Sequence, residues 1–377
     1  MNNQGENSVM LLSSTSFAAK NFLVPHVKVL SASYHVYLVC GDRKQTLELG
    51  DTNYELHHID IARHPSLSDL LAIIRYVKLA NSLKPRLVLT ITPKMALIAL
   101  ALKLCLSNTV VVGHYFTGQV WAEYTGLKRM FYKFLDKMFA NFLDFTLCDG
   151  IGQREFLISQ SVCDDAGISV LGAGSIAGVA INSDQPIRSI AHKYNEPVRL
   201  LYAGRLNSSK GLDDILYVFE RLHAEGVHFK LTIVGPDEQG YSLRFKKLSK
   251  DYPHHFDYVG YVDDVSDYYA ASDILLLSSR REGFGSVVIE AAKYGVPTVA
   301  YDIYGLRGTI IDMETGFLAP SFDREAYYSI VHKLTINRDE IERIGQQAFA
   351  YTKRNFSQDI VTSNLKSFIA SKIACNS

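Results

Sequence analysis

The sequence predicts an α/β protein built from two Rossmann-like domains that face a central cleft. Short apolar runs bounded by glycine or proline alternate with longer segments of helical periodicity, which is typical of βαβ units. The apolar runs contain few polar residues, as expected of parallel strands that are buried on both faces. The length of 377 residues exceeds what one compact core usually holds and therefore favours two domains.

Composition indicates a globular protein without a global electrostatic attraction to nucleic acid. Lysine and arginine number 39, as do aspartate and glutamate, so we expect no nucleic-acid partner. The five scattered cysteines lack metal-site spacing, which favours a reducing cytoplasm over a disulfide framework. The first eight residues lack the pattern of a signal peptide, and no uncharged apolar run reaches the roughly 20 residues that span a bilayer.

The first half of the chain predicts one parallel sheet. We expect strands at 9–12, 35–39, 56–59, 87–91 and 110–112, with helices at 18–32, 67–83 and 94–106. Ligands bind at the carboxyl ends of such strands, which here carry residues 13–16, Thr92 and His114. His114 has two interpretations, a contact to a sugar or to developing charge, or a histidine satisfied by its own loop. Trp121, the only tryptophan, is interpreted as local core.

The segment 126–145 predicts an amphipathic helix with phenylalanine, leucine and methionine on one side and lysine and arginine beside them. Helices of this composition lie in membrane interfaces. They also pack on sheets with a solvated basic face. The two interpretations are compatible, because a basic rim could still face anionic lipid.

Residues 168–171 are interpreted as a strand, and the glycine-rich 172–178 that follows as an interdomain loop. Its G-x-G-x-x-x-G spacing is one residue longer than a dinucleotide fingerprint, which disfavours an oxidoreductase. We therefore expect an N-terminal domain at 1–180, a C-terminal domain at 181–356, and a final helix in 357–377 that packs back on the first domain. The second domain predicts strands at 198–203, 229–234, 256–261, 274–277 and 298–300.

A glycine turn between the strand at 274–277 and a following helix carries the strongest functional signal. The stretch S-S-R-R-E-G-F-G-S (278–286) leads into that helix, whose first N–H groups suit an anion such as a phosphate. Glu282 and Glu290 lie on either side of the turn. Carboxylates bind phosphate poorly but accept hydrogen bonds from sugar hydroxyls, so the combination indicates a nucleotide sugar.

The loop after the strand at 198–203 supplies the cations that this interpretation needs. Arg205 follows the strand, and Lys210 precedes the next helix. An arginine fork and a lysine point charge near a helix start suit a pyrophosphate. The alternative is a solvated loop with two charges.

Five motifs in the second half resemble those of retaining glycosyltransferases of family 4, which have the GT-B fold. They are A-G-R-L-N-S-S-K-G (203–211), V-G-P-D (234–237), Y-V-G-Y-V-D-D-V (258–265), E-G-F-G-S-V-V-I-E-A (282–291) and G-V-P-T-V-A (295–300). In the first half, H-Y-F-T-G-Q-V-W (114–121) and G-A-G-S-I-A-G-V (172–179) resemble the subgroup that assembles bacterial O-antigens, capsules and lipid-linked glycans. The family's glycine-rich acceptor loop is absent, and 13–17 stands in its place.

The resemblance implies a role for each candidate residue. Arg205 and Lys210 would bind the donor diphosphate, Glu282 the sugar hydroxyls and Glu290 the ribose. Backbone groups would come from Phe284, Gly285 and Ser286 toward sugar and phosphate, and from Tyr261 and Val262 toward the base. His114 would reach the donor sugar from the other domain. Catalysis would involve His114, Arg205, Lys210 and Glu282.

The resemblance also implies the reaction and the partners. A UDP-linked sugar would be transferred with retention to a glycan or undecaprenyl-diphosphate-linked acceptor, without metal or other cofactor. The adjacent Asp263 and Asp264 are interpreted as caps of the next helix rather than as a metal pair. The enzyme would be cytoplasmic, with peripheral contact to the inner face of the plasma membrane. A nucleotide-sugar 2-epimerase of the same architecture is the alternative. A non-enzymatic binding protein would not need Arg205, Lys210, Glu282 and Glu290 together.

Overall fold

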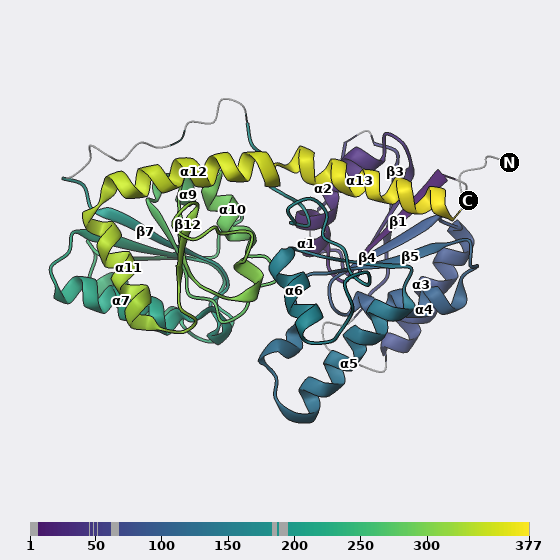
Figure 1. Cartoon of the computed structure of the whole chain (residues 1–377), viewed down its shortest axis with the longest axis horizontal. Helices are drawn as coiled ribbons and strands as arrows, with labels where there is room; N and C mark the ends of the chain where they lie inside the picture. The colour runs from purple at the N-terminus through teal and green to yellow at the C-terminus, as the bar shows by residue number, and fades with distance from the viewer. Residues whose placement is uncertain are drawn as a thin grey trace. The chain divides into compact units, whose positions relative to one another are not determined.

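The computed structural model divides the chain into two compact units, each with its own six-stranded parallel sheet (Figure 1). Unit 1 comprises Met1–Gly178 and Gln358–Ser377, and unit 2 comprises Val179–Ser357. The structure describes residues 7–44, 46–47, 49–50, 52–61, 68–182, 187 and 195–376. Of the described helices, none combines the length and apolar character needed to cross a bilayer.

The sheet of unit 1 has the strand order β3-β2-β1-β4-β5-β6. The strands are β1 (Ser8–Ser13), β2 (His35–Cys40), β3 (Tyr54–His58), β4 (Leu87–Ile91), β5 (Val111–Phe116) and β6 (Phe145–Cys148). The order reverses between β1 and β4, which is where ligands bind in doubly wound sheets. Ser14 and Thr92 follow these two strands, and their hydroxyl oxygens lie 2.9 Å apart. The polar residues expected at the strand ends thus meet at this point.

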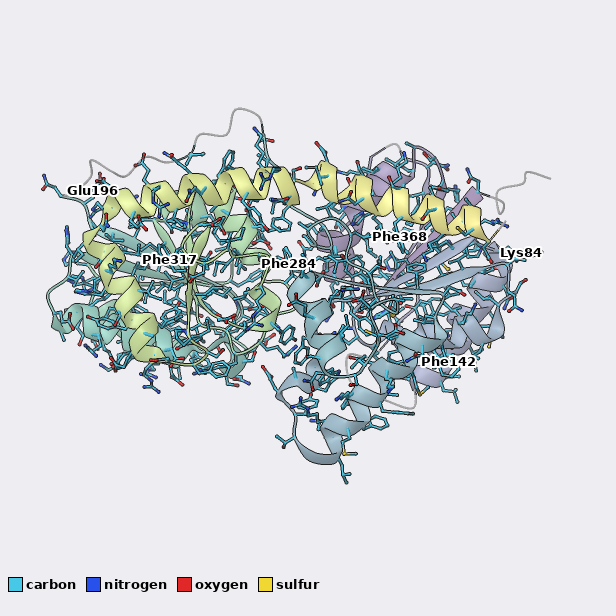
Figure 2. All side chains as sticks on the ribbon, in the orientation of Figure 1. Lys84, Phe142, Glu196, Phe284, Phe317 and Phe368 are labelled. Carbon is cyan, nitrogen blue, oxygen red and sulfur yellow. The ribbon has the colours of Figure 1, made fainter. Side chains whose placement is uncertain are left out.

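Helices cover both faces of this sheet (Figure 1). One face carries α1 (Ser16–Ala18), the π-helical turn η2 (Ala19–Leu23), α2 (Val24–Leu30) and α13 (Gln358–Cys375). The other carries α3 (Ser68–Leu83), α4 (Met95–Cys105), α5 (Gly126–Phe142) and α6 (Ile151–Ser159). Phe368 of α13 packs edge-on against Phe145, with ring centroids 5.1 Å apart (Figure 2). The last helix therefore completes the core of unit 1.

Unit 2 repeats the same plan with the strand order β12-β11-β10-β7-β8-β9. Its strands are β7 (Val198–Ala203), β8 (Phe229–Val234), β9 (Phe256–Gly260), β10 (Ile274–Leu277), β11 (Thr298–Tyr301) and β12 (Gly316–Ala319). The buried side chains of β7 and β10 are almost all apolar, because parallel strands are covered on both faces. The order reverses between β7 and β10, so the loops that follow these two strands are neighbours.

The helices of unit 2 connect its strands and cover both faces of the sheet. They are α7 (Leu212–Ala224), α8 (Ser242–Asp251), α9 (Ser266–Ala271), α10 (Ser286–Ala292), α11 (Arg324–Ile336) and α12 (Arg338–Phe356). Helices α7, α8 and α11 pack on one face, and α9 and α10 on the other. Asp264 accepts a 2.8 Å hydrogen bond from the backbone N–H of Ser266, the first residue of α9, although the N-cap residue itself is Val265. Asp263, the other predicted cap, accepts a hydrogen bond from the Tyr261 hydroxyl.

Several predictions for unit 1 differ from the structure in detail. The helix expected at 126–145 ends at Phe142, because Asp144 bonds Val112 through both backbone and side chain and leads the chain into β6. Strand β6 and helix α6 were not predicted. The strand expected at 168–171 is only an isolated bridge between Leu147 and Ser169.

The helix expected at 18–32 is also not continuous. It begins two residues earlier, at Ser16, where Thr15 caps it by accepting a 3.1 Å hydrogen bond from the backbone of Ala18. A π-helical turn then separates α1 from α2. Pro25 lies in the first turn of α2 and lacks the N–H that a continuous α-helix would use, which accounts for the irregular turn before it.

Candidate functional site

The loops after β7 and β10 are bonded to each other along their backbones. The Ser278 hydroxyl donates to the carbonyl oxygens of Gly211 and Lys210, at 2.8 and 3.0 Å. The backbone N–H of Arg280 donates to the carbonyl of Ser209 at 2.8 Å. The two loops that carry the predicted donor residues therefore form one rigid structure.

Glycine makes this close approach possible. Gly211 has a φ of +65° and precedes α7, and a Cβ there would overlap the carbonyl oxygen of Ser278. Gly235, after β8, approaches the carbonyl of Gly204 in the same way, with a φ of +146°. Residues with a side chain rarely adopt these conformations, so both positions require glycine for space and for geometry.

Lys210 and Glu282 form an ion pair where the two loops meet. The Lys210 Nζ donates to Glu282 Oε1 at 2.6 Å, and the two side chains are only 15% and 13% exposed. Lys210 ends the 3₁₀ turn η4 (Ser208–Lys210), and Glu282 lies in the glycine turn before α10. Two residues that are 72 positions apart thus present a cation and a carboxylate at one place.

Arg205 lies on the exposed side of the same loop. Its Nη1 is 3.3 Å from both carboxylate oxygens of Glu238, and its side chain is 52% exposed. Asn207 donates to the same carboxylate at 2.8 Å. Glu238 was missed because it follows a different strand, β8, and only the sheet order places it beside the β7 loop.

The start of α10 is held by contacts from a downstream segment. The Thr309 hydroxyl donates to the carbonyl of Phe284 at 2.9 Å, and Gly285 adopts a φ of +75° as the residue before the helix. Ser286 is the first residue of α10. The Phe284 ring packs edge-on against Phe356, at 5.3 Å between centroids. Phe284, Gly285 and Ser286 therefore lie directly after Glu282 in a fixed conformation.

Glu290 and Tyr261 complete the residues predicted in unit 2. Glu290 accepts a 2.9 Å hydrogen bond from the Tyr269 hydroxyl, and burial raises the pKa of its carboxyl. Tyr269 was not predicted, since nothing in the sequence around α9 marks it. Tyr261 and Val262 follow β9, and the Tyr261 side chain is 58% exposed with its hydroxyl on Asp263 at 2.9 Å.

The buried carboxylate of Asp214 holds the loop that follows β10. Asp214 in the first turn of α7 is 2% exposed and lies 2.7 Å from Nη2 of Arg280, which is two positions before Glu282. Tyr301 of β11 donates its hydroxyl to the same carboxylate at 2.9 Å. Asp214 therefore connects the β10 loop to α7 and β11. It was not predicted from the sequence.

His114 lies in unit 1, inside β5 rather than at its tip as predicted. It is 1% exposed, and burial lowers the pKa of its imidazole to about 3. Its Nδ1 lies 2.7 Å from the Thr90 hydroxyl. Its Nε2 is buried and has no hydrogen-bond partner among the described residues. Such an atom usually indicates an ordered water or a ligand.

Two further buried polar side chains follow β5 and β6, and each has one atom without a hydrogen-bond partner among the described residues. Gln119 and Asp149 are 1% and 5% exposed, and both contact Gln153, whose amide bonds the Gln119 side chain and the Asp149 backbone. Within the described part of the chain, Gln119 Nε2 and Asp149 Oδ1 lack partners. Burial raises the pKa of Asp149 to about 8, so it is largely protonated at neutral pH.

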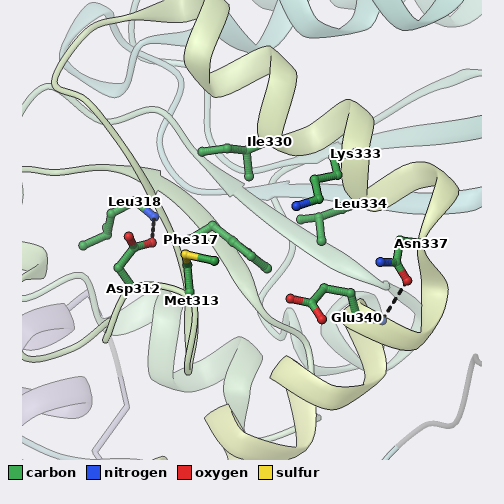
Figure 3. A pocket seen from close by; sticks show the side chains of 9 residues that line it. All are labelled: Asp312, Met313, Phe317, Leu318, Ile330, Lys333, Leu334, Asn337 and Glu340. Carbon is green, nitrogen blue, oxygen red and sulfur yellow. Dashed lines mark hydrogen bonds between the residues drawn. The ribbon is translucent and has the colours of Figure 1, made fainter.

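A pocket of about 220 Å³ elsewhere in unit 2 involves none of the predicted residues (Figure 3). It lies between β12, α11 and the start of α12, and it is lined by Asp312, Met313, Phe317, Leu318, Ile330, Lys333, Leu334, Asn337 and Glu340. The loops that carry Lys210 and Glu282 are therefore separate from this cavity.

Two family profiles match the chain, one on each unit. The family described as glycosyl transferases group 1 matches residues 183–351, and the family described as glycosyl transferase 4-like matches residues 9–138. The first covers every donor residue predicted in unit 2, and the second covers His114.

Relatives and solved structures agree with these matches. The capsular polysaccharide biosynthesis glycosyltransferase CapM of Staphylococcus aureus is 25% identical over 340 residues, 88% of each chain. The amylovoran biosynthesis glycosyltransferase AmsD of Erwinia amylovora is 27% identical over 151 residues, 40% of this chain and 42% of its own. Sucrose-phosphate synthase of Thermosynechococcus elongatus has the same fold, with a TM-score of 0.80 at 17% identity over 98% of this chain and 100% of its own. Anabaena HepE, solved in complex with UDP, has a TM-score of 0.76 at 17% identity over 97% of this chain and 100% of its own.

Proposed function

Since this chain belongs to the glycosyltransferases with the GT-B fold, we propose that it is a retaining enzyme that builds a bacterial surface polysaccharide. It moves a sugar from a UDP-linked donor to a lipid-linked glycan. CapM and AmsD support this proposal, because both are named for polysaccharide synthesis. HepE supports the UDP donor, since structures of that protein contain UDP and UDP-glucose. The names of CapM and AmsD also favour transfer over 2-epimerisation.

The ion pair between Lys210 and Glu282 is the observation that carries the donor assignment. Lys210 and Arg205 bind the donor diphosphate, and Glu282 accepts hydrogen bonds from the hydroxyls of the sugar. Because the pair joins the loops of β7 and β10, it sets the spacing between the phosphate and the sugar. A protein that bound only phosphate would not place a carboxylate 2.6 Å from its cation.

The remaining residues of unit 2 bind the rest of the donor. Glu290 accepts from the ribose hydroxyls through the oxygen that Tyr269 leaves free, and Tyr269 fixes its orientation. Tyr261 and Val262 contact the base through their backbone. Phe284, Gly285 and Ser286 direct backbone N–H groups toward the sugar and the phosphate, since the first N–H groups of a helix have no partner within it.

The reaction exchanges one bond at the anomeric carbon. The bond between this carbon and the β-phosphate oxygen breaks, and the acceptor hydroxyl attacks from the same face. The hydroxyl proton passes to the departing phosphate oxygen, so UDP leaves and the configuration is retained. Negative charge grows on the diphosphate in the transition state, where Arg205 and Lys210 stabilise it. The two cations make a metal ion or other cofactor unnecessary.

In unit 1, the acceptor contacts His114 inside β5 and the side chains of Gln119 and Asp149, which follow β5 and β6. His114 Nε2, Gln119 Nε2 and Asp149 Oδ1 are buried polar atoms without partners among the described residues, as expected of a surface that recognises hydroxyl groups. His114 is uncharged at neutral pH, because burial lowers its pKa to about 3. It therefore acts by hydrogen bonding rather than by charge. The reaction takes place in the cytoplasm at the inner face of the plasma membrane.

The test begins with a screen of nucleotide sugars by thermal shift on the full chain. Nucleotide sugars that raise the melting temperature are then incubated alone and with undecaprenyl-diphosphate-linked acceptors. The proposal expects a glycosylated lipid product with the anomeric configuration of the donor and only slow hydrolysis of the donor alone. Conversion of the donor into its 2-epimer without an acceptor would replace the proposal with the epimerase.

A further inference from the structure

Helix α5 has two apolar faces, and only one of them packs on unit 1. Toward the sheet it buries Phe139, while Tyr132 and Leu135 pack against the same core. The other face carries the largest group of exposed apolar side chains on any described helix. They are Leu127 (83% exposed), Met130 (66%), Phe131 (58%), Phe134 (58%) and Phe142 (60%). The interpretation of α5 as an ordinary packed helix therefore does not account for these five exposed residues.

The exposed residues form one continuous stripe rather than scattered positions. Leu127, Phe131 and Phe134 are spaced by four and three residues, so they lie on one face of the helix. Met130 belongs to the same stripe, and Phe142 extends it to the end of α5, where Figure 2 labels it. Single exposed apolar residues are common in soluble proteins, but a stripe of this kind marks an interaction surface.

The charges beside the stripe are almost all positive. Lys128 flanks it on one side, and Lys133 and Lys137 flank it on the other, about 100° around the helix by its 3.6-residue period. None of these lysines forms an ion pair within the described structure. The only acid in α5, Asp136, points inward and accepts a 2.6 Å hydrogen bond from the Trp121 indole. Burial raises the pKa of Asp136 to about 7, so this carboxyl is only partly ionised at neutral pH.

The neighbouring helix also exposes apolar side chains. Helix α4 packs against α5. It exposes Leu97 and Leu104, which are seven residues apart and therefore lie on one of its faces. A second copy of this chain would bring the lysines of two α5 helices together, which like-charge repulsion disfavours. An anionic lipid surface instead complements both the apolar stripe and the cations beside it.

We propose that the stripe on α5 inserts into the interfacial layer of a bilayer that contains anionic lipid, with the helix parallel to the membrane plane. Lys128, Lys133 and Lys137 contact the lipid headgroups, and Phe131 and Phe134 enter the acyl boundary. The inference rests on the proposed function in one respect: membrane binding would bring the enzyme to a lipid-linked acceptor. Membrane binding itself requires neither donor nor acceptor, so the two can fail separately.

The test is co-sedimentation of the full chain with vesicles of mixed phosphatidylglycerol and phosphatidylcholine, and with vesicles of phosphatidylcholine alone. We expect binding to the mixed vesicles that weakens as salt rises, because screening reduces the headgroup contacts. The double variant Phe131→Ser/Phe134→Ser should bind about a hundredfold more weakly, roughly tenfold for each phenylalanine. Lys133→Gln/Lys137→Gln should reduce binding to mixed vesicles to the level seen with phosphatidylcholine.

The matched control changes exposed apolar residues of unit 2. Leu243→Ser/Ile336→Ser removes side chains that are 80% and 69% exposed and should bind vesicles as the parent does. The fluorescence of Trp121, which is fully buried beside α5, reports whether each variant keeps unit 1 folded. Equal binding by the phenylalanine variant and the parent would overturn the proposal, as would failure of the parent to bind mixed vesicles. So would a dimer in light scattering that dissociates in the phenylalanine variant, since the stripe would then be a protein interface.

Discussion

The ammonium group of Lys210 donates a 2.6 Å hydrogen bond to Glu282 Oε1, although the two residues follow different strands of the unit 2 sheet. The pair exists because β7 and β10 are neighbours at the point where the strand order reverses. Ser278 and Arg280 bond the β7 loop through its backbone and hold the pair in place. In the proposed function, one loop contributes the charge that binds a diphosphate, and the other contributes the carboxylate that accepts hydrogen bonds from a sugar.

Replacing Glu282 by alanine should reduce both transfer and stability. We expect kcat/KM to fall about a hundredfold or more, the usual effect of removing one transition-state contact. The free energy of unfolding should fall by about 1–3 kcal/mol, because Lys210 would remain largely buried without its carboxylate. Transfer assays and urea denaturation measure the two effects.

The control for this variant is an exposed ion pair of the same unit. Asp251→Ala removes the partner of Lys247 on α8, where the side chains are 39% and 76% exposed. Its effect on stability should stay within about 0.5 kcal/mol, because solvent screens such pairs. Near-normal transfer by Glu282→Ala would remove this residue from the site.

Replacing Gly211 by alanine should separate the two donor loops. The new Cβ would overlap the Ser278 carbonyl, so the β7 loop must move and Lys210 must move with it. We expect loss of UDP binding together with destabilisation. Gly226→Ala is the matched control, since Gly226 has a φ of +69° but no atom within 4 Å of the added Cβ. It should lose only about 1–2 kcal/mol from its left-handed backbone and keep its UDP affinity. Equal UDP affinities for the two variants would contradict the role of loop contact.

The contribution of Asp149 to the stability of unit 1 should fall as pH rises from about 4 to about 8. The Asp149 carboxyl ionises near 3.8 when unfolded but keeps its proton up to about 8 in the fold. The folded protein therefore binds more protons than the unfolded chain in this interval, so the free energy of unfolding decreases with pH. Asp136 has the same sign, with a pKa of about 7.

Asp149→Asn isolates the contribution of that carboxyl, because the amide is neutral at every pH. Relative to the parent, the variant should be more stable at pH 8 than at pH 5. Urea denaturation followed by the fluorescence of Trp121 measures this difference, since the only tryptophan lies in unit 1. A difference that is the same at both pH values would show that Asp149 is ionised in the fold.

Removal of metal ions should leave transfer unchanged. In the proposed function, Arg205 and Lys210 supply the positive charge where UDP departs, and we expect that step to need no divalent cation. We expect equal rates with and without EDTA, after dialysis of enzyme and substrates against a chelating resin. A rate that falls with EDTA and returns with magnesium would show that the two cations are not sufficient.

Much of the architecture and the donor loops could be predicted because the signals are local. Buried parallel strands produce apolar runs such as 274–277, and a glycine turn before a helix is visible in consecutive residues. The motifs around Arg205, Lys210 and Glu282 are contiguous in the same way. Their positions in the structure differ little from the sequence-based expectation.

The positions of the residues that were not predicted depend on the order of the strands in the sheet and on which face of a helix is buried. Glu238, Asp214 and Tyr269 each come from a separate element and meet the site only through the sheet. Asp149 was missed together with β6, because the apolar periodicity of α5 continues into 142–145 and hides the strand. Periodicity also could not tell which apolar face of α5 is buried, and the phenylalanines of the second face are exposed.

Calorimetric titration of UDP into the parent protein and into Lys210→Ala tests the donor site most directly. Charged hydrogen bonds contribute roughly 1.5–3 kcal/mol, so the variant should bind UDP about ten- to a hundredfold more weakly. Uridine, which lacks the diphosphate, should bind both proteins equally. Equal Kd values for UDP in the parent and in Lys210→Ala would contradict the assignment of this site to a nucleotide sugar.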